Sequence, residues 1–309
     1  MSHVGEQAQP DGFRADFHPV AMQWTCLHCG GEAGRAAAER FDWGFLDGIY
    51  CISLRHREDR AQDTARELHR IGLCKRAVFY RPSKDRVAKR GCWESHRAVA
   101  ADARARGLQR VLIVEDDVDF PAATTPATAR RVGAALASLP SDWMGFYLGH
   151  WALWAYPVRR NVLRCSSLCT HAYVASERLL DWLCESPFDR RAEIARRRIG
   201  GKGIDTAFAV LPAMYAYAPL LATQRHVSND HLKASRIRLW PPRKLFLDLF
   251  VRSRIREHAM AHAMGANEKL VTALTSLALP GVWAARRLSR PRADRKRAAI
   301  LAPGVSDPS

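Results

Sequence analysis

Short apolar runs alternate with amphipathic segments along the middle of the chain. Strands are predicted where the apolar runs are short and bounded by polar turns, at residues 49–54, 77–80, 111–114, 144–148 and 170–175. Helices are predicted where apolar residues recur at helical spacing, at residues 61–70, 92–106, 127–138 and 177–184. Strands that alternate with helices in this way predict an α/β fold with a mainly parallel sheet.

The same pattern divides the chain into three parts. Residues 1–45 show no periodicity and are expected to form an N-terminal extension, whereas residues 46–233 carry the alternating strands and helices. Residues 234–309 mix Leu, Phe, Ile and Trp with Arg and Lys. They are expected to form a basic helical tail, with amphipathic helices at 243–258 and 268–288.

Positive charge is concentrated in this tail. The 309 residues carry a net charge of +17, and residues 233–300 hold 16 Lys and Arg against 4 Asp and Glu. An anionic membrane surface and nucleic acid both present the dense negative charge that such a segment attracts. No nucleic-acid-binding module accompanies the charge, so the membrane surface is the favoured partner of the two.

Hydropathy and cysteine usage bear on the location of the chain. No apolar run reaches the roughly 18 residues that a membrane span needs. The first 16 residues lack a basic segment followed by an apolar block, so we expect no secretory signal. These features predict a cytoplasmic protein that attaches to the inner face of the membrane through its tail.

Eight cysteines are expected to be reduced and packed as small apolar residues rather than paired in disulfides. Cys26 and Cys29 flank His28 as in half of a zinc site, but no second pair with suitable spacing stands nearby. A zinc site is therefore not favoured there.

Three consecutive carboxylates, Glu115, Asp116 and Asp117, come directly after the apolar strand 111–114. Adjacent carboxylates repel each other and are costly to desolvate. Open α/β sheets hold ligands at the carboxyl ends of their strands, and a divalent metal bridged to a diphosphate would neutralise the cluster. The alternative is a solvated turn in which Asp116 or Asp119 caps the next segment, and the triplet alone leaves both open.

The residues around the triplet resemble the central motif of glycosyltransferase family 25. The motif consists of Gly-Cys-x-x-Ser-His at 91–96, then a strand and Glu-Asp-Asp-Val-x-Phe at 115–120. The first strand and the Arg-x-Asp-Arg turn at 57–60 are similar to the first strand and turn in the sequence pattern of that family. Later blocks extend the resemblance to about His231. The family includes lipopolysaccharide-type sugar transferases and the collagen galactosyltransferases.

The resemblance implies a Rossmann-like fold of the nucleotide-sugar transferase type A class. It implies that Asp117 and Glu115 bind Mn²⁺ or another divalent cation, although Glu-Asp-Asp is not a strict Asp-x-Asp and leaves the metal requirement open. The residues expected to bind a UDP-sugar donor are Ser53, Arg57, Asp59, Arg60, His96, Glu115 and Asp116. Arg57 and Arg60 suit phosphate because of their charge and fork geometry; the alternative is a helix start with solvated charges. For His96 the alternative is a structural histidine.

Asp205 matches an acidic residue of the family and is the expected general base, with a helix cap as the alternative. Gln224, Ser228 and Asp230 match a block that closes the site. The expected activity is transfer of a hexose, galactose from UDP-galactose, with inversion, onto a glycan or lipid-linked acceptor. The alternatives are a basic protein that binds nucleic acid or membrane, and a catalytically inactive transferase-like scaffold.

Overall fold

The computed structural model describes residues 40–188, 203–225 and 262–277. Several predicted features lie outside these residues, namely the Cys26–Cys29 segment, Ser228, Asp230 and the helix at 243–258. The six cysteines within the described residues are all free thiols, as predicted.

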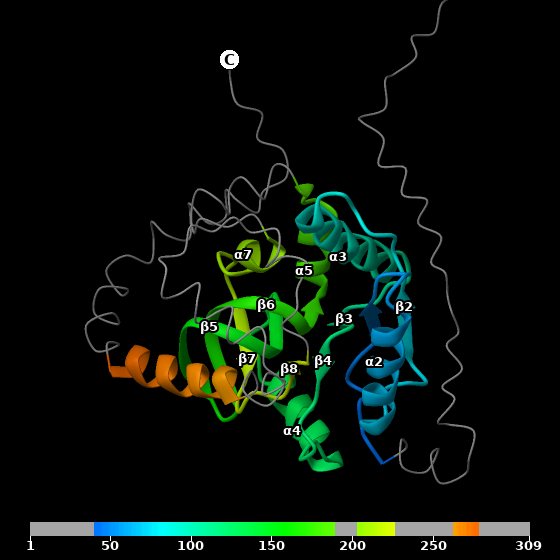
Figure 1. Ribbon diagram of the computed structural model, residues 1–309. Coiled ribbons are helices and arrows are strands. Elements are labelled where there is room, and N and C mark those ends of the chain that lie inside the picture. Colours follow the sequence, from blue (N-terminus) through cyan, green and yellow to red (C-terminus); the bar gives the residue numbers. More distant parts are fainter. Residues whose placement is uncertain (1–39, 189–202, 226–261, 278–309) are drawn as a thin grey trace, which may run out of the picture.

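A six-stranded sheet forms the centre of the described chain, in the order β2-β1-β3-β6-β5-β7 (Figure 1). Its strands are β1 (Gly48–Ile52), β2 (Ala77–Tyr80), β3 (Arg110–Glu115), β5 (Gly145–Arg159), β6 (Val162–Ser176) and β7 (Met214–Tyr217). β1 is parallel to β2 and β3, and β5 is parallel to β7, whereas β6 is antiparallel to β3, β5 and β7. All the strands except β6 therefore point the same way, which confirms the predicted α/β fold with a mainly parallel sheet.

Helices lie on both sides of this sheet. They are α2 (Glu58–Arg70), α3 (Ala88–Ala105), α4 (Pro126–Ala137), α5 (Glu177–Cys184) and α7 (Ile204–Phe208). α3 contacts α5 and α7, while α2 contacts the short strand β4 (Val118–Asp119). Figure 1 shows α3, α5 and α7 towards the top of the view and α2 and α4 towards the bottom.

The helix boundaries follow from local chemistry. α4 begins with Pro126 at its first position and a capping box between Thr125 and Thr128. The chain leaves α2 through Gly72, whose φ of 76° suits glycine at a helix end. α3 begins at Ala88, earlier than predicted, so that Gly91 lies inside the helix, where a side chain would overlap Asp85.

The largest difference from the prediction is the hairpin of β5 and β6, each 15 residues long. The sequence predicted only residues 144–148 at the start of β5 and 170–175 at the end of β6, where β6 pairs with β3. The hairpin turns at Asn161, which has a φ of 59°, and its strands shift register at several bulges. Each bulge breaks the alternation of apolar and polar residues by which a strand is identified.

The hydrophobic core extends beyond the predicted boundary at residue 46. The Trp43 side chain is buried, and its indole nitrogen donates to the carbonyl oxygen of Ile71 at 2.7 Å. Phe45 also packs against the core. Part of the expected N-terminal extension therefore packs into the α/β domain.

The described part of the predicted basic tail is a helix over residues 262–277. Met264 is fully buried, and the Asn267 amide donates to the carbonyl oxygen of Ala152 on β5 at 3.1 Å. One face of this helix therefore packs on the domain. Within the described residues, every helix is too short or too polar to cross a membrane.

Candidate functional site

A pocket opens where the chain leaves β1 and β3. Ile52 and Glu115 end these two parallel strands in register. From β1 the chain runs to β2 on one side, and from β3 it runs through β4 and α4 to β5 on the other side. The pocket therefore lies where the two connections diverge, which is the usual ligand position in open α/β sheets. Its empty volume is about 920 Å³, part of it open to solvent. The lining residues are Ile52, Leu54, Arg57, Arg60, Lys84, Asp85, Ala88, Gly91, Cys92, Ser95, His96, Glu115, Asp116, Asp117 and Gln224.

The fold brings most of the predicted site residues together here. Six of the predicted donor and metal residues line the pocket, namely Arg57, Arg60, His96, Glu115, Asp116 and Asp117. Ser53 lies buried and contacts Asp116, whereas Asp59 is mostly exposed. Gln224 also lines the pocket, because β8 (Thr223–Gln224) pairs with β4 directly after the acidic triplet.

Asp116 is held by both neighbouring elements. The Ser53 hydroxyl donates to one carboxylate oxygen at 2.9 Å, and Arg60 of α2 donates to the other at 3.2 Å. The Thr64 hydroxyl donates to the Asp116 carbonyl oxygen at 2.9 Å. Burial raises the pKa of the Asp116 carboxyl, and the Arg60 charge opposes this. Asp116 thus fixes the start of α2 against the ends of β1 and β3.

Asp117 is buried with one carboxylate oxygen, Oδ1, that has no hydrogen-bond partner in the described chain. Burial raises the pKa of Asp117 to about 8, and the charges of Glu115 and Asp116 add to this effect. A buried carboxylate oxygen is costly to leave unpaired. A divalent cation would satisfy it and offset the repulsion within the triplet, so these residues fit the metal that the sequence predicted.

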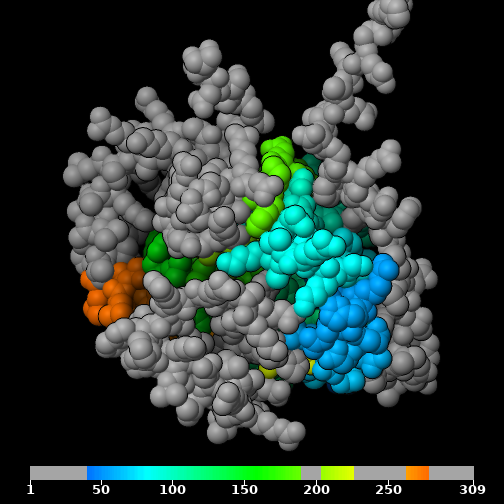
Figure 2. Space-filling model, turned by 45° about the horizontal axis from the view of Figure 1, so that its top comes forward, coloured from blue at the N-terminus to red at the C-terminus, as the bar shows by residue number. Residues whose placement is uncertain are grey.

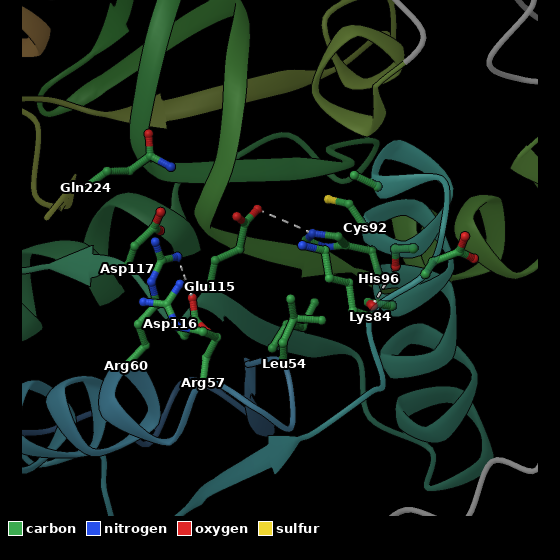
Figure 3. A pocket seen from close by; sticks show the side chains of 15 residues that line it. Leu54, Arg57, Arg60, Lys84, Cys92, His96, Glu115, Asp116, Asp117 and Gln224 are labelled. Carbon is green, nitrogen blue, oxygen red and sulfur yellow. Dashed lines mark hydrogen bonds and ion pairs between the residues drawn. The ribbon is translucent and has the colours of Figure 1, made fainter. Parts of the chain in front are cut away.

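The Glu115 carboxylate is turned towards α3 and β6. Its Oε1 accepts from the Thr170 hydroxyl at 2.8 Å and lies 3.5 Å from His96 Nε2. Burial acts to raise the pKa of Glu115, but the contacts with His96 and Thr170 outweigh it and lower the pKa to about 2. Glu115 lies between Asp117 on one side and Cys92 and His96 on the other (Figure 3).

His96 is fully buried and held in place from β6. Its Nδ1 and the Tyr173 hydroxyl are hydrogen-bonded at 2.8 Å, and the two rings stack with centroids 5.7 Å apart. Its Nε2 has no hydrogen-bond partner among the described residues. Three atoms that could bind a metal, one from each of Cys92, His96 and Glu115, lie within 4.8 Å of one another.

Three basic side chains, those of Arg57, Arg60 and Lys84, line the same pocket. Arg57 forms a two-point contact with Asp59, at 3.0 and 2.9 Å, which lowers the pKa of Asp59 to about 2. Arg57 and Arg60 lie together on one side of the pocket (Figure 3). Lys84 lines the pocket too, and the sequence analysis missed it. The signal that could have identified it is its place in the polar loop after β2, a neighbour of β1.

Asp205 lies near this pocket without lining it. It is half-buried in the first turn of α7, and its Oδ1 accepts from the Thr206 amide at 2.8 Å. α7 contacts α3, so Asp205 lies on the α3 side of the pocket. The N-cap of α7 is Gly203, so Asp205 lies inside the first turn and is not the helix cap that the sequence offered as the alternative.

Comparisons with known proteins do not assign the chain to a family. Neither a family model nor a curated protein matches it. Among solved structures, a mannose-1-phosphate geranyltransferase from Thermus thermophilus is similar with a TM-score of 0.33 and 11% identity, over 55% of this chain and 73% of that chain. A UDP-glucose pyrophosphorylase complexed with UDP-glucose is similar with a TM-score of 0.33 and 10% identity, over 55% and 72%. Similarity this low leaves the function to be argued from the pocket itself.

Proposed function

We propose that the pocket binds a nucleoside-diphosphate sugar together with a divalent cation, and that the protein transfers the sugar to an acceptor. The observation that carries this proposal is the buried carboxylate of Asp117, with an unpaired oxygen, beside Glu115 and close to basic side chains. A carboxylate pair at the end of a buried strand suits a cation, and arginines beside it suit phosphate.

Each side chain has a distinct role in this proposal. Asp117 and Glu115 hold the cation, which supplies stabilisation of the negative charge on the departing diphosphate. Arg57 and Lys84 reach the phosphates from the pocket wall. Arg60 acts chiefly through Asp116, because its guanidinium already donates to that carboxylate.

The finer assignment rests on the resemblance to glycosyltransferase family 25. We propose UDP-galactose as the donor, Mn²⁺ as the cation and inversion at the anomeric carbon, with a glycan or lipid-linked hydroxyl as the acceptor. Asp205 takes the proton of that hydroxyl as it attacks, and UDP leaves. The position of Asp205 on α7, which contacts α3 of the pocket wall, supports this role.

Replacing Asp205 with asparagine tests the general base. Asparagine keeps the side-chain oxygen Oδ1, so the contact with the Thr206 amide can persist while proton acceptance is lost. We expect kcat for UDP release from UDP-galactose with a glycan acceptor and Mn²⁺ to fall about 10²- to 10⁴-fold, with donor affinity retained. Asp181→Asn, an exposed carboxylate on α5 paired with Arg104, is the matched control. Unchanged turnover in Asp205→Asn would show that Asp205 is not the general base.

Attachment to an anionic membrane surface is a second candidate function. The helix over residues 262–277 lies at the opposite edge of the molecule from α2 (Figure 1 and Figure 2). Leu270, Leu274 and Leu277 are exposed on it at 60%, 57% and 78%. Their i, i+4, i+7 spacing makes an outward apolar stripe, and the basic residues of 233–256 and 286–297 flank this helix in the sequence.

Changing these three leucines to serine is expected to reduce flotation with vesicles that contain phosphatidylserine, while the melting temperature stays close to that of the parent. Flotation on neutral phosphatidylcholine vesicles is expected to be weak for both proteins, because the basic tail then finds no opposite charge. Equal flotation of parent and variant on anionic vesicles would show that the stripe makes no contribution.

A further inference from the structure

We propose that Cys92, His96 and Glu115 form a second cation site, which takes a zinc-class divalent ion with sulfur, nitrogen and oxygen ligands. This site shares Glu115 with the proposed donor-cation site but does not include Asp117, and it goes beyond the proposed sugar transfer. It is supported by the placement of the three ligands, by the orientation of His96 and by the chemistry of the donor set.

The first support is placement. Cys92 and His96 are four residues apart on α3 and so lie on the same face of the helix. Glu115 ends β3, and its carboxylate points at them (Figure 3). The three ligand atoms lie within 4.8 Å of one another, and the Glu115 Oε1 to His96 Nε2 distance is 3.5 Å. In a tetrahedral zinc site, with bonds of about 2.0–2.1 Å to nitrogen and oxygen, two such ligands are about 3.4 Å apart.

The second support is the orientation of His96. The ring is fully buried, yet Nε2, the nitrogen that faces Glu115, has no hydrogen-bond partner in the described part of the protein. The other nitrogen, Nδ1, is held by the Tyr173 hydroxyl at 2.8 Å. Histidines that bind metals have their second nitrogen fixed by such a partner, which sets the tautomer and the direction of the ring. In the metal-bound form Nδ1–H donates to the Tyr173 oxygen, and Nε2 is free for the ion.

The third support is the donor set. A thiolate and an imidazole with one carboxylate suit Zn²⁺ or Co²⁺, whereas Mn²⁺ and Mg²⁺ prefer oxygen ligands such as those of Asp117. Cys92 and Glu115 both line the pocket. Three protein ligands with a fourth position open to a pocket are the arrangement of zinc sites that exchange a water or a substrate atom.

Cobalt titration of the full chain tests the site, because bound Co²⁺ reports its ligands and geometry by absorption. The protein should carry Cys26→Ser and Cys29→Ser, since that pair could itself bind cobalt. We expect a sulfur-to-cobalt charge-transfer band and the intense visible bands of tetrahedral cobalt, both saturating at one ion per chain and both removed by Zn²⁺.

Three further variants locate the ion. Cys92→Ser is expected to lose the charge-transfer band, whereas Cys184→Ser, a half-buried cysteine on α5 away from the pocket, is expected to keep it. Tyr173→Phe is expected to weaken cobalt binding about 10- to 100-fold, because His96 loses its second contact.

Two results would overturn the proposal: no thiolate band in the Cys26→Ser/Cys29→Ser protein, or a band that persists in Cys92→Ser. The variant Asp117→Asn separates the test of the cobalt site from the test of the proposed sugar transfer. This variant removes Asp117, the donor-cation ligand that the cobalt site does not share, and is expected to keep the cobalt band. If the parent protein shows the band but binds no nucleotide sugar, the sugar-transfer proposal fails and the cation site stands.

Discussion

Replacing Asp117 with asparagine is expected to make the ligand-free protein more stable and to abolish its stabilisation by a UDP-sugar with Mn²⁺. Burial and the charges of Glu115 and Asp116 raise the pKa of Asp117 to about 8. Asparagine has nearly the same shape and carries no charge. The variant therefore removes an unfavourable buried charge and, with it, a ligand for the cation.

The pH dependence follows from the direction of this shift. Between the ordinary aspartate pKa of 3.8 and about 8, the folded protein holds a proton on Asp117 that the unfolded chain releases. The free energy of unfolding therefore falls as pH rises through this window and levels off above it. Asp117→Asn does not undergo this fall in the free energy of unfolding. The variant is therefore no more stable than the parent below about pH 4, and its extra stability grows towards pH 8. We expect a gain on the order of 2 kcal/mol at pH 8, or about 4–8 °C in melting temperature.

Thermal and urea unfolding at pH 5 and pH 8 measure this effect without any ligand. Asp85→Asn is a useful comparison, because Asp85 also lines the pocket but its pKa is lowered by the hydrogen bond from Arg90. That variant is expected to be slightly less stable than the parent at both pH values. An Asp117→Asn protein that is less stable than the parent at pH 8 would contradict the placement of Asp117 as a buried carboxylate with one unpaired oxygen.

Replacing Arg60 with alanine is expected to have the largest effect on stability. Arg60 and Asp116 form an ion pair in which each side chain is only 11% exposed. Removal of one partner of a buried pair leaves the other charge uncompensated and costs about 3–5 kcal/mol. Without the guanidinium, the pKa of Asp116 is expected to rise further, since Arg60 is the leading effect that now lowers it.

Arg57→Ala is the matched control for this prediction. Arg57 pairs with Asp59 near the surface, where the two side chains are 32% and 65% exposed, and such pairs contribute about 1 kcal/mol or less. Urea unfolding should therefore show a much larger loss of stability for Arg60→Ala than for Arg57→Ala. Adding Asp116→Asn to Arg60→Ala should recover part of the lost stability. Equal, small effects of Arg57→Ala and Arg60→Ala would contradict the role of Arg60 in fixing Asp116.

The position of the site was predictable because it depends on strand ends. The apolar run before Glu115 identified β3, and the first strand was identified in the same way. Parallel strands end at one edge of a sheet, so residues that come after β1 and β3 meet there whatever the intervening loops do. Asp116 and Asp117, which follow β3, therefore line the same pocket as Arg60, which the resemblance to glycosyltransferase family 25 pointed to.

The contacts that orient the site residues were not predictable in the same way. Thr170 and Tyr173 come from β6, which inserts antiparallel beside β3 and places their hydroxyls on Glu115 and His96. Bulges in the long hairpin hide its alternation, so its register could not be derived from the sequence. The turn of the Glu115 carboxylate towards α3 follows from that register.

Calorimetric titration of UDP-galactose into the full-length protein tests the central claim most directly, because it measures donor and cation binding without knowledge of the acceptor. With Mn²⁺ present, we predict saturable binding at one nucleotide per chain, which weakens strongly when a chelator replaces the metal and is absent in Asp117→Asn. Binding of equal strength with and without a divalent cation, or no binding of any UDP-sugar, would contradict the assignment of this pocket.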